Sequence, residues 1–471
     1  MYIAKVKISN ILGFNGSRNA DLDFKRPNGK YAGWTVLAGR NGSGKTSLLR
    51  CLALVSAGSE IAPRIAPSYI TWSADPSIDG QVSAYFHLDA RDLKATYGGS
   101  APAMPGSIIN RTIMLHSDAD TGTGGGPRGR ARSAWMEDLP DFLLPAIARG
   151  PSSPEFPKGI WGSTSGVWFV AGYGPFRRLS PDSTDPLPEH FAETVPGRVL
   201  KAAERFSTLF NEDASLNGGL SWLVGLHLRQ LEGHKASGRL LTGVLDILSD
   251  GLLPDGYQAM RVNSQGLWIR HGRKSFPIRS MSDGYRAVIA LVLDIIRNLD
   301  DFYGGVQVSR ARGHLAVRRP GVILIDEIDA HLHVSWQQRI GGWLTRHFPQ
   351  IQFIVSTHSP YICQAADPGG LIRLPGPNEQ IGPRVVAEDL RRRIVYGSGD
   401  DAAMSELFGL DTPYSERAEE LRRELVQLEG KVLRGKASKE EQSRYSSLSE
   451  TLSSSPSARI DEVAARLGRG R

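Results

Sequence analysis

Gly39-Arg40-Asn41-Gly42-Ser43-Gly44-Lys45-Thr46 is the stretch that decides the fold, since it fits the phosphate-loop pattern G-x-x-x-x-G-K-S/T at every required position. Glycines let backbone N–H groups converge on phosphate oxygens, an approach that a Cβ would obstruct. Residues 33–38 have the pattern of a strand, and residues from 46 to about 57 that of a helix. This strand–loop–helix order is the context that the motif requires, so we predict a nucleoside triphosphate site here.

The residues of this loop have distinct predicted roles. Lys45 is expected to reach the β- and γ-phosphates, and the Thr46 hydroxyl is expected to bind Mg²⁺. The positive end of the following helix adds to the attraction for phosphate. The predicted nucleotide contacts of the loop are Gly39, Asn41, Gly42, Ser43, Gly44, Lys45, Thr46 and Ser47.

A second fragment, Val322-Ile323-Leu324-Ile325-Asp326-Glu327, ends in adjacent carboxylates after four consecutive apolar residues. Such a run is typical of a strand that is buried on both faces, and its end lies at the edge where open α/β sheets bind ligands. Asp326 is therefore predicted to orient Mg²⁺ through a water. Glu327 is predicted to polarise the attacking water as general base.

A further apolar strand, residues 351–357, is followed by His358. One helix, residues 336 to about 348, separates it from the carboxylate strand, so the two strands should be neighbours in a parallel sheet. That arrangement would aim His358 at the γ-phosphate, and we predict a catalytic role for it. The alternative is a purely structural histidine.

The segment Ser282-Asp283-Gly284-Tyr285-Arg286, which opens a helix over residues 287–297, resembles the signature segment of ABC-type ATPases. Together with residues 329–333 and 357–360, it makes the chain similar to the branch that contains RecF, the SMC proteins and the overcoming-lysogenisation-defect ATPases. The resemblance covers roughly residues 1–60, 165–180 and 258–375. The alternative for residues 282–286 is a plain helix N-cap.

The resemblance implies an α/β P-loop fold of ABC type, with a parallel or mixed central sheet, in which two nucleotide domains sandwich ATP and Mg²⁺. Ser282 and Gly284 would then reach the γ-phosphate held by a second copy of the chain, in a homodimer or higher homo-oligomer. Asp329 and His331 would lie at the dimer seam, and His358 would be the switch histidine. A hydroxyl, a glycine N–H and a helix N-terminus make an anion site, which agrees with this expectation.

The chain departs from the family pattern at three places. Asp283 stands where the family has the first glycine of the signature, and Tyr285 stands at the usual Gln or Glu position. The strand at residues 167–173 leads to Arg177 and Arg178 with no glutamine where the family's Q-loop would supply one. Arg177 is therefore a predicted phosphate contact, although either arginine could instead contact DNA or serve a structural role.

We predict four regions along the chain. Residues 1–195 form a first nucleotide-binding lobe that carries a Gly-rich surface insertion at about 98–134, and residues 196–257 form an inserted helical subdomain. Residues 258–384 form a second lobe, in which 301–320 is a basic connection. Residues 385–471 are charged and helical, with a helical hairpin that turns at Gly435 and restarts at a capping box, Ser438-x-x-Glu441.

Composition restricts the class of protein. The 471 residues include no apolar run near the roughly 20 residues of a membrane helix, and the N-terminus lacks the pattern of a signal peptide. The two cysteines, Cys51 and Cys363, are expected to be buried thiols in a cytoplasmic protein. The net charge of +7 is compatible with nucleic acid as a partner, although the arginine clusters could equally be solvated loop charge.

The sequence favours one class of ATPase over its relatives. The 196–257 insertion is too short for the long heptad coiled coils of SMC proteins, and the segment after 375 lacks the carboxylate pattern of a nuclease domain. What remains is a compact ATPase that resembles the ATPase subunits of bacterial anti-phage systems. This resemblance implies a sensor or switch subunit that controls a separate nuclease or toxin encoded in the same operon. The alternative is a RecF-like DNA-binding repair ATPase. The absence of a Q-loop glutamine argues against a transport ATPase.

Overall fold

The structure is a computed structural model, which describes residues 1–88, 108–116, 132–138, 168–177, 197–216, 218–253, 256–311, 313–410 and 412–452. The chain divides into two compact units, Met1–Phe408 and Gly409–Arg471. The first unit contains all of the predicted nucleotide site. The predicted boundaries at 195, 257 and 384 all fall inside it and stay predictions.

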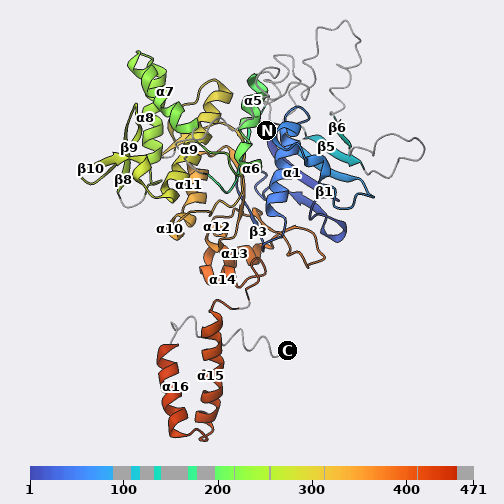
Figure 1. The fold of residues 1–471 in the computed structure, drawn as a ribbon, viewed down its shortest axis with the longest axis vertical. Helices are drawn as coiled ribbons and strands as arrows, with labels where there is room; N and C mark the ends of the chain where they lie inside the picture. The colour runs from blue at the N-terminus through green and yellow to red at the C-terminus, as the bar shows by residue number, and fades with distance from the viewer. Residues whose placement is uncertain are drawn as a thin grey trace. The chain divides into compact units, whose positions relative to one another are not determined.

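A six-stranded sheet lies at the centre of the first unit (Figure 1), in the order β16-β15-β3-β14-β13-β7. All neighbouring strands pair in parallel except β15 and β16. The strand predicted at 167–173 is present from Val170 to Tyr173, and the predicted strands at 33–38, 322–325 and 351–357 are confirmed as members of this sheet. Its strands are β3 (Gly33–Ala38), β7 (Val170–Tyr173), β13 (Gly321–Ile325), β14 (Ile351–Thr357), β15 (Leu371–Arg373) and β16 (Arg384–Val385).

A second, antiparallel sheet has the strand order β2-β1-β4-β5-β6. Helix α1 (Lys45–Ala57) packs against strands of both sheets, and its apolar side chains Leu48 and Leu52 are fully buried. The helix therefore starts at the phosphate loop and is held in the core between the sheets. The strands of this sheet are β1 (Tyr2–Ser9), β2 (Ala20–Asp23), β4 (Gly80–His87), β5 (Ile108–His116) and β6 (Arg132–Asp138).

The predicted surface insertion at 98–134 is wrong in part. Strand β5, inside this segment, pairs with β4 along its length, and its side chains Ile113 and Leu115 are buried. The Gly- and Ser-rich average of the whole segment hid this short apolar alternation. The remainder of 98–134, apart from the first residues of β6, lies outside the described residues.

Helices and a small sheet follow β7 in the sequence. The helical subdomain predicted for 196–257 contains helices as expected, and its side chains Leu223, Val244 and Ile247 share a core with the signature helix. The helices are α5 (Gly197–Glu204), α6 (Ser207–Phe210), α7 (Gly218–Leu231), α8 (Lys235–Ser249) and α9 (Asp283–Tyr303), and the small antiparallel sheet contains β8 (Tyr257–Asn263), β9 (Gly266–His271) and β10 (Lys274–Pro277).

Two sequence-based assignments around this region are corrected by the structure. The basic connection predicted at 301–320 contains a hairpin, β11 (Val308–Ala311) and β12 (His314–Val317). The helix predicted at 336–348 is two helices, α10 (Val334–Gln337) and α11 (Ile340–His347). The remaining helices of the first unit are α2 (Ala62–Ile65), α12 (Pro360–Cys363), α13 (Glu388–Tyr396) and α14 (Gly399–Ala403), with 3-10 turns at Gly16–Arg18, Tyr69–Thr71 and Ile278–Ser280.

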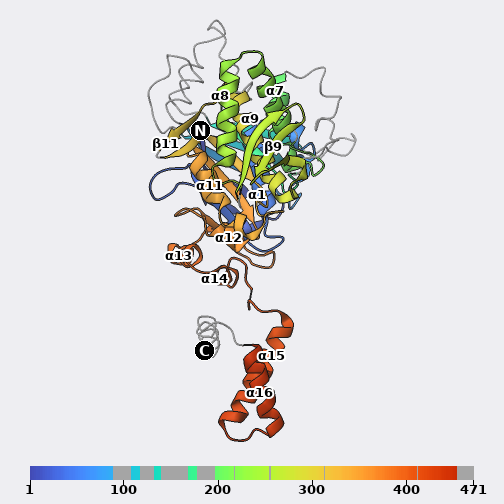
Figure 2. The same cartoon turned by 90° about the vertical axis from the view of Figure 1, so that its left-hand side faces the viewer.

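The second unit contains a helical hairpin, α15 (Glu416–Leu433) and α16 (Lys439–Thr451), visible in Figures 1 and 2. Gly435 adopts φ +67°, a conformation that favours glycine, at the turn between the helices. The capping box of Ser438 and Glu441 is present at the start of α16. The predicted hairpin is confirmed.

Both cysteines are buried free thiols, as predicted. Burial raises the pKa of Cys51 to about 12 and also raises that of Cys363, so neither is a reactive thiolate at neutral pH. Within the described ranges, the helices are all too short or too polar to cross a membrane.

Candidate nucleotide site

The phosphate loop lies between β3 and α1, and its backbone requires glycine at several points. Gly42 and Gly44 have φ of +73° and +92°. A Cβ placed on Gly39 would lie 2.4 Å from the carbonyl oxygen of Leu374. The predicted glycines are therefore needed for the shape of the loop itself, in addition to the approach of a phosphate.

Lys45 folds back over this loop. Its Nζ donates to the carbonyl oxygens of Gly39 at 2.8 Å and Arg40 at 3.0 Å. Burial lowers the pKa of Lys45 to about 8, and the opposing attraction of Asp326 and Glu327 recovers only part of the shift. The ammonium group thus lies against the carbonyl groups of the phosphate loop and near the carboxylates of Asp326 and Glu327.

The two motifs that are far apart in the sequence meet at Asp326. Thr46 donates its hydroxyl hydrogen to Oδ2 of Asp326 at 2.7 Å, and Ser356 donates to Oδ1 in a short hydrogen bond. A hydroxyl and a carboxylate side by side are the oxygen ligands that Mg²⁺ prefers. Ser356 was missed by the sequence analysis, although a lone serine near the end of an apolar strand was an available signal.

Glu327 begins the turn that leaves β13. Its backbone N–H donates to Ser356 Oγ at 2.8 Å, so one serine holds both neighbouring carboxylate residues. Glu327 adopts φ +43°, which is uncommon for a residue with a Cβ. Its side chain is half-buried, at the edge of the sheet where β3, β14 and β13 lie side by side.

His358 follows β14, which pairs with β3 on one side and with β13 on the other. The predicted parallel pairing of β14 with the carboxylate strand is confirmed, so the histidine emerges between the phosphate loop and the carboxylate turn. Its contact with the γ-phosphate stays a prediction. Asp329 fixes the backbone there, since its Oδ1 accepts from Thr357 Oγ1 at 2.5 Å and from the N–H of His358 at 3.4 Å. Burial, and secondly the charge of Lys45, lower the pKa of His358, so its ring is neutral at pH 7.

Arg177 lies directly beneath the carboxylate turn. Its guanidinium donates to the carbonyl oxygens of Gly174, Asp326, Glu327 and Ile328 at distances from 2.8 to 3.3 Å. The structure thus gives this arginine backbone partners, while its predicted contact with phosphate stays a prediction. Arg178 lies outside the described residues.

The signature segment packs on the loop that follows the carboxylates. Ser282 is the exposed N-cap of α9, and its side chain makes no capping hydrogen bond. A Cβ on Gly284 would lie 2.5 Å from the carbonyl oxygen of His331, which explains the glycine. The ring of Tyr285 packs edge-on against Trp336 at 5.7 Å, so the tyrosine at this departure from the family pattern contributes to the core.

No hydrogen bond within the described part of the chain joins Ser282 or Gly284 to the phosphate loop of the same chain. The trans role expected for these two residues therefore stays a prediction. The remaining loop residues, Asn41, Ser43 and Ser47, lie on the same turn or on the first turn of α1, and Ser43 Oγ is buried beside Gly39.

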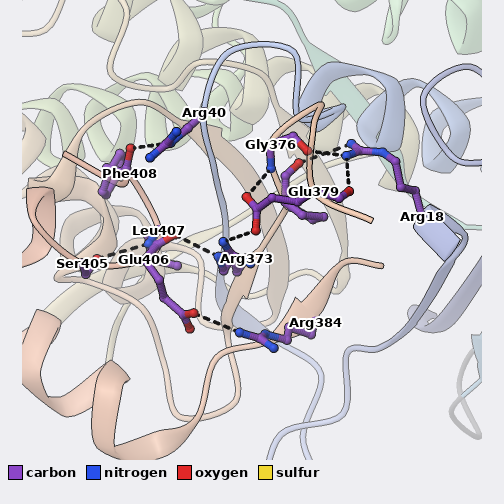
Figure 3. Close-up of polar contacts among 11 residues, drawn as sticks. Arg18, Arg40, Arg373, Gly376, Glu379, Arg384, Ser405, Glu406, Leu407 and Phe408 are labelled. Carbon is purple, nitrogen blue, oxygen red and sulfur yellow. Dashed lines mark hydrogen bonds and ion pairs between the residues drawn. The ribbon is translucent and has the colours of Figure 1, made fainter. Parts of the chain in front are cut away.

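A polar network, absent from the sequence-based predictions, supports the outer side of the phosphate loop (Figure 3). Arg40 Nε donates to the carbonyl oxygen of Phe408 at 3.2 Å. Arg373, at the end of β15, donates to the carbonyl oxygen of Glu406 at 2.9 Å and pairs with Glu379 at 2.6 Å. The segment 405–408 and the loop after β15 are therefore fixed against the nucleotide site.

These residues fit a nucleotide with its metal. The loop offers backbone N–H groups at a place where no Cβ fits, and Thr46 with Asp326 offers oxygen ligands of the kind that Mg²⁺ takes. The cation of Lys45 would neutralise phosphate charge. Site geometry alone therefore supports a P-loop nucleotide site.

Comparisons with known families agree with the site. A family model described as "AAA domain, putative AbiEii toxin, Type IV TA system" matches residues 202–364, and one described as "AAA domain" matches residues 5–118. Septu protein PtuA of Bacillus mycoides (strain KBAB4) is 25% identical over 363 residues, which are 76% of this chain. The match spans only 38% of the length of that PtuA, so the relative is much longer than the matched part.

The "Retron Ec83 probable ATPase" of Escherichia coli is 42% identical over 93 residues, 20% of this chain and 16% of its own length. Among solved structures, the SMC head domain from Thermotoga maritima aligns with 82% of this chain and 100% of its own, at 16% identity and a TM-score of 0.40. From the sequence matches and the phosphate-loop site, we conclude that the chain carries AAA-type P-loop sequence and is similar to Septu PtuA and to the retron probable ATPases.

Proposed function

We propose that the chain binds ATP and Mg²⁺ between two copies of itself and hydrolyses ATP there. One observation carries the proposal. The phosphate loop, the Asp326–Glu327 pair and His358 meet at one sheet edge, whereas Ser282, at the exposed start of α9, makes no hydrogen bond to them within the described part of the same chain. An exposed hydroxyl at a helix N-terminus is suited to a phosphate brought by a partner.

Each residue has a defined part in this reaction. Lys45 binds the β- and γ-phosphates, and Thr46 with Asp326 holds Mg²⁺, which screens phosphate charge when it is bound. Glu327 accepts a hydrogen bond from the attacking water and takes its proton. The neutral ring of His358 donates a hydrogen bond to, or accepts one from, a group near the γ-phosphate. Its lowered pKa keeps the ring uncharged there.

Mixing two inactive variants tests the shared site. In a mixed dimer of Lys45→Ala and Ser282→Arg, one site carries both changes and the other carries neither. Each variant alone should be inactive, while an equal mixture should recover about a quarter of the wild-type ATPase rate, since half of the dimers are mixed and each keeps one site. Steady-state phosphate release measures this rate. A mixture as inactive as its components would contradict the trans role of Ser282.

We further propose that this ATPase is a sensor or switch subunit in an anti-phage system, where it controls a separate nuclease or toxin. The support is its similarity to Septu PtuA and to the retron ATPases. Closure of a dimer around ATP would report the assembled state to the effector. Copurification of the tagged chain with the products of neighbouring genes, in the presence and absence of ATP, tests this part of the proposal.

A RecF-like DNA-binding ATPase is the second candidate, and the small sheet β8–β9–β10 favours it. Residues 257–282 contain five Lys and Arg residues and no Asp or Glu. All five of these side chains are exposed: Arg261, Arg270, Arg273, Lys274 and Arg279. The guanidinium of Arg261 lies 5.1 Å above the ring of Trp268, which fixes its direction. A basic surface with an aromatic residue is suited to a phosphate backbone.

Charge reversal on this sheet separates the two candidates. If the sheet binds duplex DNA, Arg261→Glu/Arg270→Glu should weaken binding at least tenfold and lower the slope of log K against log salt by about 2. The matched control, Lys25→Glu/Lys30→Glu, makes the same change in net charge at exposed residues far away in the sequence. Fluorescence anisotropy across a salt series gives both values. An identical loss in the two variants would contradict a site on β8–β9–β10.

A further inference from the structure

We propose that Arg177 is a positioning residue for hydrolysis, which holds the backbone turn of Glu327 so that its carboxylate faces the attacking water. The inference rests on the proposed ATPase function and deepens it. Arg177 follows β7, and β7 pairs in parallel with the carboxylate strand β13. The arginine thus follows the end of the strand next to β13, and from there its guanidinium reaches the backbone of Glu327.

The hydrogen bonds of Arg177 are directed at the turn itself. Nη1 donates to the carbonyl oxygen of Asp326 at 2.9 Å, and Nη2 donates to those of Glu327 at 3.0 Å and Ile328 at 3.3 Å. One guanidinium therefore binds three consecutive carbonyl oxygens. A fourth bond, from Nη1 to the carbonyl oxygen of Gly174 at 2.8 Å, anchors the same group to its own strand end.

The conformation of the turn explains why such a support is needed. Glu327 has φ +43°, a region in which a residue with a Cβ persists only when its surroundings hold it. Ser356 holds the N–H of Glu327 at 2.8 Å, and Arg177 holds its carbonyl oxygen, so the residue is fixed on both sides. Loss of either hydrogen bond would let the turn relax, and the Glu327 carboxylate would move.

Arg177 stays charged in this position. Burial lowers its pKa to about 10, and attraction to Asp329, Asp326 and Glu327 opposes that shift. Its side chain is only 3% exposed, and its two terminal nitrogens are already bonded to carbonyl oxygens. A phosphate contact would require those bonds to break, whereas a positioning role uses the contacts that exist.

A double-mutant cycle tests the inference. Arg177→Met removes every donor and keeps most of the length of the side chain, so kcat should fall about 10- to 100-fold with KM and ATP affinity within about twofold. In a Glu327→Gln background the same change should lower the residual rate by less than twofold, because Arg177 acts through Glu327. Arg177→Lys, which keeps the charge and some donors, should retain an intermediate kcat.

Arg111→Met is the matched control, since Arg111 is another buried arginine that bonds backbone carbonyl oxygens, those of Val55 and Ser56. It should lower the melting temperature and leave kcat per folded molecule unchanged. Equal losses of rate with and without Glu327, or a weakened ATP affinity in both backgrounds, would overturn the positioning role and favour a phosphate contact. A wild-type chain that hydrolyses no ATP would instead contradict the proposed function itself.

Discussion

Glu327→Gln should abolish nearly all hydrolysis and leave ATP binding intact. The glutamine keeps the size of the side chain and its hydrogen bond to water, but it cannot accept the proton, so kcat should fall by about 10²- to 10⁴-fold. The bonds that hold residue 327, from its N–H to Ser356 and from Arg177 to its carbonyl oxygen, are made by the backbone and survive the substitution. The variant should therefore keep its fold and its affinity for ATP.

Because the trapped ATP holds the proposed dimer together, the same variant should stay dimeric with ATP and return to monomer without it. Single-turnover phosphate release and light scattering with and without ATP give the two readouts. Glu429→Gln makes the same chemical change on an exposed face of α15 and should behave as wild type in both. Hydrolysis by Glu327→Gln at the wild-type rate would show that the base has been assigned wrongly, whatever the oligomeric state.

The meeting of these residues could be predicted from the sequence because each lies at a strand end. Parallel strands align their carboxyl ends, so a phosphate loop after β3, carboxylates after β13 and a histidine after β14 must share one edge. The apolar runs of β13 and β14 were enough to identify both as buried strands. Neither the strand assignment nor the shared edge depended on a contact between distant side chains.

The parts that were missed depend on contacts that leave no pattern in the sequence. Arg177 binds carbonyl oxygens, and a carbonyl group is present at every residue, so nothing in the sequence names its partners. Strand β5 lies between β4 and β6 in the antiparallel sheet, although it comes from a segment rich in glycine where composition argued for a loop. The hydrogen bond from Arg40 to the carbonyl oxygen of Phe408 joins residues that are 368 positions apart in the sequence.

Lys45→Ala should abolish measurable ATP binding. The ammonium group of Lys45 bonds back over the loop, to the carbonyl oxygens of Gly39 and Arg40. When ATP binds, Lys45 can exchange these two hydrogen bonds for bonds to phosphate oxygens at little cost in free energy. Alanine leaves the phosphate charge uncompensated, so the Kd for ATP should rise by at least about 100-fold. Isothermal titration measures the Kd, and Lys30→Ala, at an exposed residue before β3, is the control.

The lowered pKa of Lys45 gives this prediction a pH dependence whose sign is fixed. The folded pKa of about 8 lies below the ordinary value of 10.5, so between these values the folded state binds fewer protons than the unfolded state. The free energy of unfolding of the wild type, relative to Lys45→Ala, should therefore rise by about 1 kcal/mol from pH 7 to pH 9. ATP affinity should change in the opposite direction and fall above pH 8, because binding then requires the uptake of a proton. An affinity that stays constant to pH 9.5 would mean that Lys45 does not titrate where its buried position predicts.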